Sequence, residues 1–240
     1  MFKNFYIFVF LVLLSGCATQ KPPMSSHDPY ESYNRAMFNF NMAFNDVIGE
    51  PVGKAYKNYV PQPAQTGISN FVINLRMPLN MVNNFLQGNV ERGLGDFMRF
   101  TINTVFGIGG ILDIATPAGL PYEKEDLGQT FYKWGVWTES SFIVMPILGA
   151  YTVRELVGAV GDASYNPTYP YVIQTDLEGR TVIFAVDSFN SYVSVLDYVD
   201  QLKEMHDPYI FYRESYLQHR TNLIYNGKPP VNPLDDFDFN

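Results

Sequence analysis

Apolar residues recur at steps of three and four along most of the chain, and this periodicity constrains the fold more than any other feature. In the first such stretch, Tyr33, Met37, Phe40, Phe44 and Val47 mark one face of a helix. The other stretches with this spacing are residues 68–86, 90–105, 127–134, 182–205 and 207–225. The sequence therefore predicts an all-α, single-domain fold of amphipathic helices.

Prolines and glycines divide this pattern into short pieces. The first helix is expected to end at Gly49, and Pro78 is expected to interrupt the second. The apolar block of residues 142–150 is too short to cross a bilayer as a regular helix. Thr152 and Glu155 have the spacing of a capping box at the start of a further helix. We therefore expect short, angled helices rather than a regular bundle.

The first 16 residues have the features of an export signal. Lys3 precedes an apolar run at residues 5–14, which has the length of a secretory signal and is too short to span a bilayer. Leu-Ser-Gly then leads into Cys17, the single cysteine of the chain. This arrangement is typical of a bacterial lipobox, whose cysteine is acylated and anchors the mature protein. The alternative is an ordinary signal peptide with an incidental cysteine. Ala18 follows in place of an inner-membrane retention aspartate, which favours the outer membrane.

The composition of the segments suggests a simple domain organisation. We expect a lipoprotein signal peptide at residues 1–16 and a polar, lipidated tether at 17–27. The helical domain is expected at 28–226, followed by an acidic flexible tail at 227–240.

Charge and residue counts argue against several classes of function. The chain carries 16 Lys and Arg against 24 Asp and Glu, a net charge of −8, which disfavours nucleic-acid binding. One cysteine excludes an internal disulfide framework, and three histidines offer little material for a metal site. The nucleophile-elbow motif G-x-S-x-G is missing from the sequence. We therefore expect no catalytic residues, no metal and no cofactor.

Several segments of the chain form a long, ordered set of motifs. They are 28–35 (DPYESYNR), 59–64 (YVPQPA) with 67–71 (GISNF), 81–88 (MVNNFLQG), 99–110 (RFTINTVFGIGG) with Asp113, 128–136, 146–155, and 207–209 with Arg213 and Glu214. Together these segments resemble the MlaA (VacJ) family of outer-membrane lipoproteins. The similarity covers about residues 28–220, and residues 156–206 match only loosely.

The resemblance implies a fold and a function. Members of this family are expected to form a helical ring that lies in the inner leaflet of the outer membrane of a Gram-negative bacterium, around a central amphipathic channel. The resemblance implies that misplaced outer-leaflet phospholipids descend through this channel to a periplasmic Mla lipid carrier, which maintains lipid asymmetry. It also implies association with a trimeric outer-membrane porin and, in some pathogens, a contribution to virulence. The 16% of aromatic residues suits a ring that is apolar both outside and inside.

Polar and glycine residues on otherwise apolar segments supply the site candidates. Asparagines are concentrated between residues 34 and 89, where their amides either meet lipid headgroups or are satisfied by internal hydrogen bonds. Arginines on apolar helices either bind headgroup phosphate or form ordinary ion pairs. The glycines of residues 107–110 form either a gate hinge or a simple bend. The channel and gate candidates are Phe40, Asn41, Met42, Phe44, Gly107, Gly109, Gly110, Ile111 and Leu112, and the headgroup candidates are Arg35, Arg76, Arg99 and Arg154.

Three competing interpretations stay open at this level. The chain could be a porin-associated structural lipoprotein without transport activity. A lipid-modifying enzyme would need reactive side chains such as His206 and His219. A membrane-surface lipoprotein with an ordinary closed core would bury most of its Phe, Tyr and Met side chains.

Overall fold

The computed structural model describes residues 28–166, 168 and 177–230. The expected signal peptide, Cys17 and the tether lie outside the described residues, and the expected tail is described only to residue 230. The elements are α2 (Glu31–Phe44), the π-helical turn η1 (Asn45–Gly49), α3 (Glu50–Tyr59), α4 (Gln62–Leu86), α5 (Val90–Val105), α6 (Leu127–Lys133), β1 (Phe142–Met145), β2 (Gly149–Thr152), α7 (Val153–Tyr165), α8 (Leu177–Lys203) and α9 (Pro208–Ile224).

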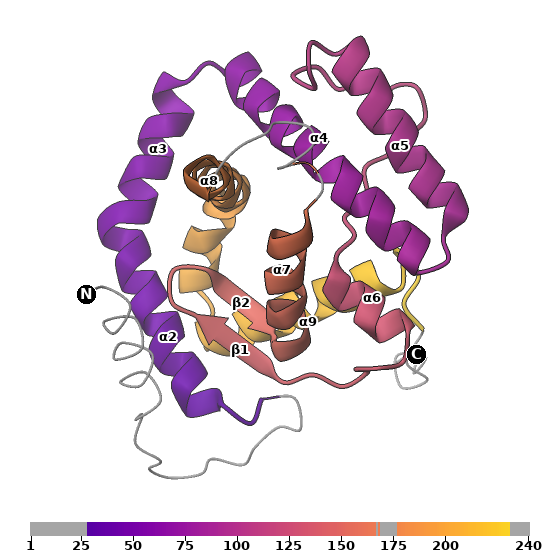
Figure 1. Cartoon of the computed structure of the whole chain (residues 1–240). Helices are drawn as coiled ribbons and strands as arrows, with labels where there is room; N and C mark the ends of the chain where they lie inside the picture. Colours follow the sequence, from indigo (N-terminus) through magenta and orange to yellow (C-terminus); the bar gives the residue numbers. More distant parts are fainter. Residues whose placement is uncertain (1–27, 167, 169–176, 231–240) are drawn as a thin grey trace, which may run out of the picture.

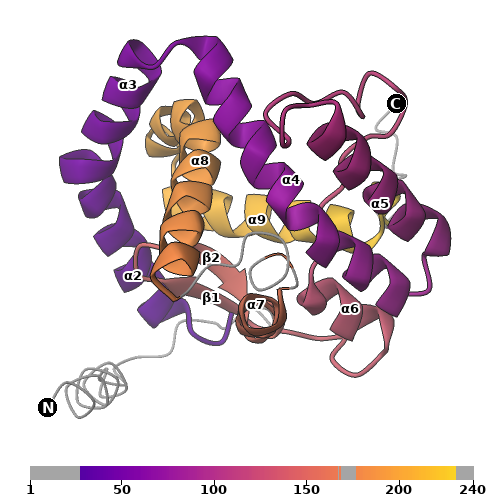
Figure 2. The ribbon, with the colours of Figure 1, turned by 45° about the horizontal axis from the view of Figure 1, so that its top comes forward.

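The helices are arranged as an outer arc around inner elements (Figure 1). The segments α2, η1 and α3 follow one another along one side, and α4 turns back with α5 packed against it. The hairpin, α7, α8 and α9 lie inside this arc, and α8 contacts α3, α4 and α9 (Figure 2). Within the described ranges, the helices are all too short or too polar to cross a membrane.

Two predicted helix breaks, at Pro78 and at Gly49, are wrong. Pro78 lies inside α4, which continues for 25 residues from Gln62 to Leu86. An interior proline removes one backbone hydrogen bond, but the extensive packing of α4 against α5 holds the helix together across the gap. The first helix likewise does not end at Gly49, because η1 joins α2 directly to α3. Pro51 falls in the first turn of α3, directly after the π-helical turn.

The apolar block at 142–150 contributes to a small antiparallel hairpin, so the fold is mostly helical rather than purely so. Phe142 pairs with Thr152, and Met145 pairs with Gly149. Pro146 lies in the turn between the strands, where no ladder hydrogen bond is required. Ile147 adopts a left-handed backbone conformation in this turn, with φ of 66°.

Capping at the start of α7 follows the prediction. The Thr152 hydroxyl accepts a hydrogen bond from the Glu155 amide, and the Glu155 carboxylate accepts one from the Thr152 amide at 2.9 Å. The hairpin therefore leads directly into a helix whose first backbone donors are satisfied.

Apolar and polar side chains are distributed in an unusual way. The compact hydrophobic cluster is small, comprising Phe38, Phe142, Val144 and Tyr209. Large apolar side chains instead stand exposed on the outer helices, including Leu94, Phe97, Met98, Val105 and Phe106 on and after α5. This distribution is the opposite of what a closed-core lipoprotein requires.

The buried face of α4 is rich in asparagine. Asn74, Asn80, Asn83 and Asn84 are all almost completely buried. The Asn84 amide donates to the Asp96 carboxylate at 2.8 Å, which joins α4 to α5. The Asn74 amide donates to the Thr104 hydroxyl at 2.9 Å. Internal hydrogen bonds therefore satisfy the side-chain nitrogens of these asparagines, in agreement with one of the two interpretations of the pattern, whereas the side-chain oxygens of Asn74 and Asn84 are buried without a partner among the described residues.

Candidate functional site

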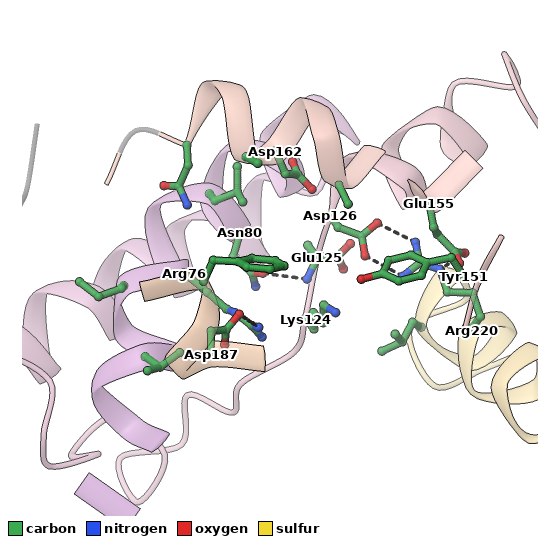
Figure 3. A pocket seen from close by; sticks show the side chains of 18 of the residues that line it. Arg76, Asn80, Lys124, Glu125, Asp126, Tyr151, Glu155, Asp162, Asp187 and Arg220 are labelled. Carbon is green, nitrogen blue, oxygen red and sulfur yellow. Dashed lines mark hydrogen bonds and ion pairs between the residues drawn. The ribbon is translucent and has the colours of Figure 1, made fainter. Parts of the chain in front are cut away.

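A cavity of about 320 Å³ lies at the centre of the fold, between α4, the segment before α6, β2, α7, α8 and α9 (Figure 3). This volume is at the lower end of the range for small-molecule sites, about 300–1,000 Å³. Its apolar lining includes Val72, Leu75, Leu79, Ala159, Ala163, Ile183, Phe184 and Leu223. Its charged lining comprises Arg76, Lys124, Glu125, Asp126, Glu155, Asp162, Asp187 and Arg220.

Helical spacing explains how both kinds of side chain reach this cavity. On α4, the lining residues fall at positions 72, 75, 76, 79 and 80, which lie on one face of a helix. On α7, they fall at positions 155, 159, 162 and 163, again on one face. Each helix therefore presents a mixed apolar and charged stripe, and the cavity wall is amphipathic.

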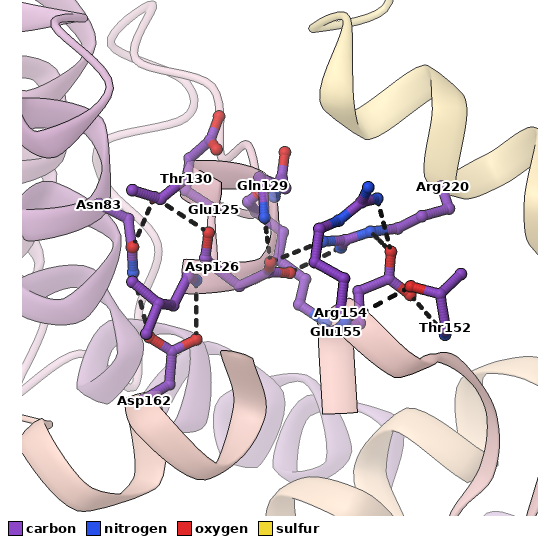
Figure 4. A network of polar contacts seen from close by, with 12 residues as sticks. Asn83, Glu125, Asp126, Gln129, Thr130, Thr152, Arg154, Glu155, Asp162 and Arg220 are labelled. Carbon is purple, nitrogen blue, oxygen red and sulfur yellow. Dashed lines mark hydrogen bonds and ion pairs between the residues drawn. The ribbon is translucent and has the colours of Figure 1, made fainter. Parts of the chain in front are cut away.

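A buried ion network closes one side of the cavity (Figure 4). Arg220 of α9 donates to both carboxylate oxygens of Asp126 at 2.6 Å and also pairs with Glu155. Asp126 is the N-cap of α6 and accepts a hydrogen bond from the Gln129 amide. Burial acts to raise the pKa of Asp126, but the charge and hydrogen bonds of Arg220 outweigh it and hold that pKa far below its usual range. The network thus ties α6, α7 and α9 together.

A second ion pair lies on the opposite side of the lining. Arg76 of α4 pairs with Asp187 of α8. Burial acts to lower the pKa of Arg76, and the neighbouring Asp187 carboxylate more than compensates, so the net direction is upward. This pair links the outer arc to α8 and keeps both charges at the cavity wall (Figure 3).

Two other carboxyl groups of the lining are held partly neutral. Burial raises the pKa of Glu125 to about 7, although a hydrogen bond from Gln87 acts in the other direction. Burial also raises the pKa of Asp162 to about 6, against hydrogen bonds from the Leu127 amide and from Asn83. The cavity therefore carries less negative charge near neutral pH than its count of acidic residues implies.

The structure separates the four headgroup candidates. Only Arg76 belongs to the described lining of the cavity. Arg35 pairs with Glu31 and with Asp207 at the start of α9. The guanidinium of Arg99 is buried and donates to Thr116 and to the Leu120 carbonyl.

Arg154, the last of the four headgroup candidates, forms hydrogen bonds with backbone carbonyls. Its guanidinium donates to the carbonyls of Trp137 and Thr138 at 3.0 and 3.1 Å. Arg99 and Arg154 are both less than 5% exposed, so their charges stabilise loops inside the fold.

The channel and gate candidates occupy two places away from this lining. On α2, the Asn41 side chain hydrogen-bonds both the Met145 carbonyl and the Ile147 amide, and so fixes the hairpin turn. Its neighbour Phe40 is exposed, whereas Met42 packs against the hydrophobic cluster and Phe44 is half-buried.

The glycine-rich turn after α5 packs against α4. A Cβ on Gly110, whose φ is +99°, would come within 2.5 Å of the Asn74 side chain. A Cβ on Gly107 would meet the Leu112 carbonyl at 2.2 Å. Gly109 has a φ of +69° and open space around it, and the side chains of Ile111 and Leu112 are exposed. The glycines are therefore needed for this tight turn.

Most of the charged lining was not among the predicted site residues. Asp126, Glu155 and Arg220 come from three elements that are distant in the sequence, so spacing gives no sign that they meet. The one available signal was Asp126 directly before the short helix, since aspartate is a preferred N-cap. In the part of the chain that the structure describes, no three His, Cys, Asp or Glu side chains are placed to hold a metal ion.

Comparisons with known proteins extend over nearly the whole chain. A family model described as MlaA lipoprotein matches residues 26–223. The chain is 37% identical to the intermembrane phospholipid transport system lipoprotein MlaA of Shigella flexneri and 36% identical to that of Escherichia coli strain K12. Both similarities cover 92% of this chain and 89% of the relative.

A solved structure from work on the structural basis for maintenance of bacterial outer membrane lipid asymmetry has a similar fold. It superposes with a TM-score of 0.73 at 35% sequence identity, and covers 82% of this chain and 98% of the other. With the family model spanning residues 26–223 and relatives this similar over most of their length, the chain belongs to the MlaA lipoprotein family.

Proposed function

We propose that the chain is the outer-membrane lipoprotein of an intermembrane phospholipid transport system, and that it removes mislocalised phospholipid from the outer leaflet. The observation that carries this proposal is the central cavity, whose wall combines apolar and charged side chains. Moving acyl chains into water costs about 0.8 kcal/mol per methylene, so they need an apolar path, whereas the headgroup needs a polar one. The MlaA relatives, which are named for intermembrane phospholipid transport, support the same function.

The proposed position is in the inner leaflet of the outer membrane of a Gram-negative bacterium, with the periplasmic face open to a lipid carrier. Exposed apolar side chains on α4 and α5 support contact with acyl chains, among them Phe71, Val82, Phe85, Leu94 and Phe97. Acylation of Cys17 would supply the anchor. We propose a passive conduit without catalysis, which moves phospholipid from the outer leaflet to the lipid carrier.

The gate role of residues 107–112 belongs to this proposal. Ile111 and Leu112 are exposed apolar side chains next to tightly packed glycines. Substitutions at Ile111 and Leu112 test the gate more cleanly than Gly110→Val, because a side chain on Gly110 collides with Asn74 and would disturb folding. The channel candidates on α2 are Phe40, Asn41, Met42 and Phe44. We propose that they act by positioning the hairpin turn, which the Asn41 side chain holds by two hydrogen bonds.

A trimeric porin is the proposed partner within the membrane, and the alternative function is that of a porin-associated structural lipoprotein without transport. The two functions differ in what they require of the cavity. Transport needs it to be open, whereas a structural role does not.

Filling the cavity therefore tests the proposal. Ala159 and Ala163 both line it and stand one helical turn apart on α7. In a deletion strain, outer-leaflet phospholipid would be followed with an outer-membrane phospholipase as reporter. Complementation would use the wild type, the double variant Ala159→Phe with Ala163→Phe, and Cys17→Ala. Ala36→Phe, at an exposed position of α2, is the matched control.

The expected results separate the two functions. Deletion raises outer-leaflet phospholipid, and the wild type and Ala36→Phe restore it to normal. The filled variant and Cys17→Ala fail to do so at equal protein levels. Full rescue by the filled variant would favour the structural function, and no rise on deletion would refute both the transport role and its route.

A further inference from the structure

The positively charged side chains of the cavity differ in whether they have an acidic partner. Arg220 is engaged by Asp126 and Glu155, and Arg76 is engaged by Asp187. Lys124 also lines the cavity, but its ammonium group makes no hydrogen bond or ion pair among residues 28–166, 168 and 177–230. Figure 3 shows Lys124 between the Arg76–Asp187 pair and the Asp126–Arg220 pair.

The backbone that carries Lys124 is fixed, although it belongs to no helix or strand. The buried side chain of Asn80 donates to the Glu123 carbonyl and accepts from the Glu125 amide at 2.8 Å, so one asparagine holds the chain on both sides of the lysine. Gln129, also buried, donates to the Lys124 carbonyl at 2.9 Å. The backbone that carries the unpaired ammonium group is thus fixed by three hydrogen bonds with the buried side-chain amides of Asn80 and Gln129.

The surroundings of Lys124 disfavour an unpaired charge. Its side chain is accessible within the cavity, yet protein surrounds it closely enough that desolvation lowers its pKa. Arg76 and Arg220 act in the same direction, while Asp126 and Asp187 oppose them. The carboxylates that could neutralise Lys124 are already committed, since both oxygens of Asp126 accept from Arg220. A cation held in such a place is suited to an anion that arrives from outside the chain.

We propose that Lys124 is the phosphate-binding residue of the cavity, which contacts the phosphodiester of a phospholipid during its passage. This inference rests on the proposed transport function. A lysine binds phosphate as a point charge without the paired geometry of arginine, which suits a contact that must also be released. The two arginines of the lining serve instead to hold the walls together.

Binding of short-chain probes to the purified full chain in maltoside micelles tests this inference by calorimetry. Dihexanoylphosphatidylcholine carries the phosphate as its single anionic group, dihexanoylglycerol lacks it, and inorganic phosphate lacks the acyl chains. The variants are Lys124→Gln, Lys124→Arg and the control Lys133→Gln. Lys133 lies on α6 outside the described lining, with its ammonium 5.9 Å from the Tyr225 ring centroid.

We expect Lys124→Gln to weaken phosphatidylcholine binding by about tenfold to hundredfold, the value of one charged hydrogen bond. Lys124→Arg should bind at least as tightly as the wild type, and Lys133→Gln should bind as the wild type does. Dihexanoylglycerol binding should not depend on Lys124. The melting temperature of Lys124→Gln should equal or exceed that of the wild type, because the variant loses an unpaired charge rather than a structural contact.

The remaining outcomes each contradict a defined part of the argument. Equal phosphatidylcholine binding by Lys124→Gln and the wild type would overturn the role of Lys124 and leave the transport function standing. Binding of inorganic phosphate but not of phosphatidylcholine would identify a free-phosphate site and overturn the lipid assignment. Failure of the wild type to bind any phospholipid probe would count against the proposed function itself.

Discussion

The ion network around Arg220 allows a quantitative prediction. The Arg220 side chain is 7% exposed and makes two 2.6 Å hydrogen bonds to Asp126 besides its pair with Glu155. Arg220→Met keeps much of the side-chain volume but leaves two buried carboxylates without their cation. Removing one partner from a buried ion pair costs about 3–5 kcal/mol, which is a large part of a typical stability of about 5–15 kcal/mol. For a domain of this size, that loss lowers the melting temperature by roughly 10 °C.

Urea unfolding of the full chain in detergent micelles, followed by circular dichroism, measures this loss. The control is Arg92→Met, because Arg92 pairs with Glu123 at the surface, where an ion pair contributes about 0–1 kcal/mol. The deficit of Arg220→Met should be greatest near neutral pH and shrink on acidification, as protonation of Asp126 removes its buried charge. A loss below about 1 kcal/mol, or one equal to that of Arg92→Met, would refute the view that this network holds α6, α7 and α9 together.

Four further substitutions test other parts of the fold by their effect on stability. Burial raises the pKa of Glu125 to about 7, above its unfolded value, so its stabilising contribution is present in acid and lost as the pH rises through 7. Glu125→Gln should therefore raise the free energy of unfolding at pH 8 by up to about 3 kcal/mol and leave it unchanged near pH 4. Melting curves at the two pH values measure this effect, and equal shifts at both would contradict it. Gly158→Ala places a Cβ 2.5 Å from the Gly128 amide nitrogen and should lower the free energy of unfolding in urea by about 1–3 kcal/mol. Gly95→Ala is its control, because a Cβ there meets nothing within 4 Å, and it should stabilise α5 by about 0.5–1 kcal/mol. Asn34→Ala removes both hydrogen bonds to the edge of β1 and should cost at least about 2 kcal/mol by the same assay; wild-type stability would show that the hairpin does not depend on α2.

Helical periodicity predicted most of the elements, and the errors have a common physical origin. The expected interruption at Pro78 rested on local backbone chemistry, but α4 gains enough from its contact with α5 to continue through the proline. The block at 142–150, expected to belong to an all-α fold, pairs into a hairpin with Pro146 in its turn. Local sequence signals mark where the backbone is weakened, and tertiary contacts decide whether it changes direction there.

The site was less accessible to sequence reasoning than the fold. Arg76 was found because a charge on an apolar helix is conspicuous. Arg220 and Glu155 belong to segments in which charges are common, and their meeting with Asp126 depends on the packing of three helices. Lys124 lies in an irregular segment rich in charged residues, where it looks like an ordinary solvated side chain. Its position became evident only from the amides of Asn80 and Gln129 that fix the backbone around it.

The distribution of polar and apolar side chains on α4 affects the heat capacity of unfolding. This helix buries asparagines while Ile68, Phe71, Val82, Phe85 and Leu86 already stand exposed in the folded chain. The heat capacity of unfolding comes mainly from newly hydrated apolar surface, and ordinary domains gain about 12–15 cal/mol/K per residue. Without lipid or detergent on its outer surface, this chain has less apolar area left to hydrate, and it releases more polar area. We therefore expect its stability to vary less with temperature than that of a globular domain of equal length, and an amphiphile added to cover α4 and α5 should restore the curvature.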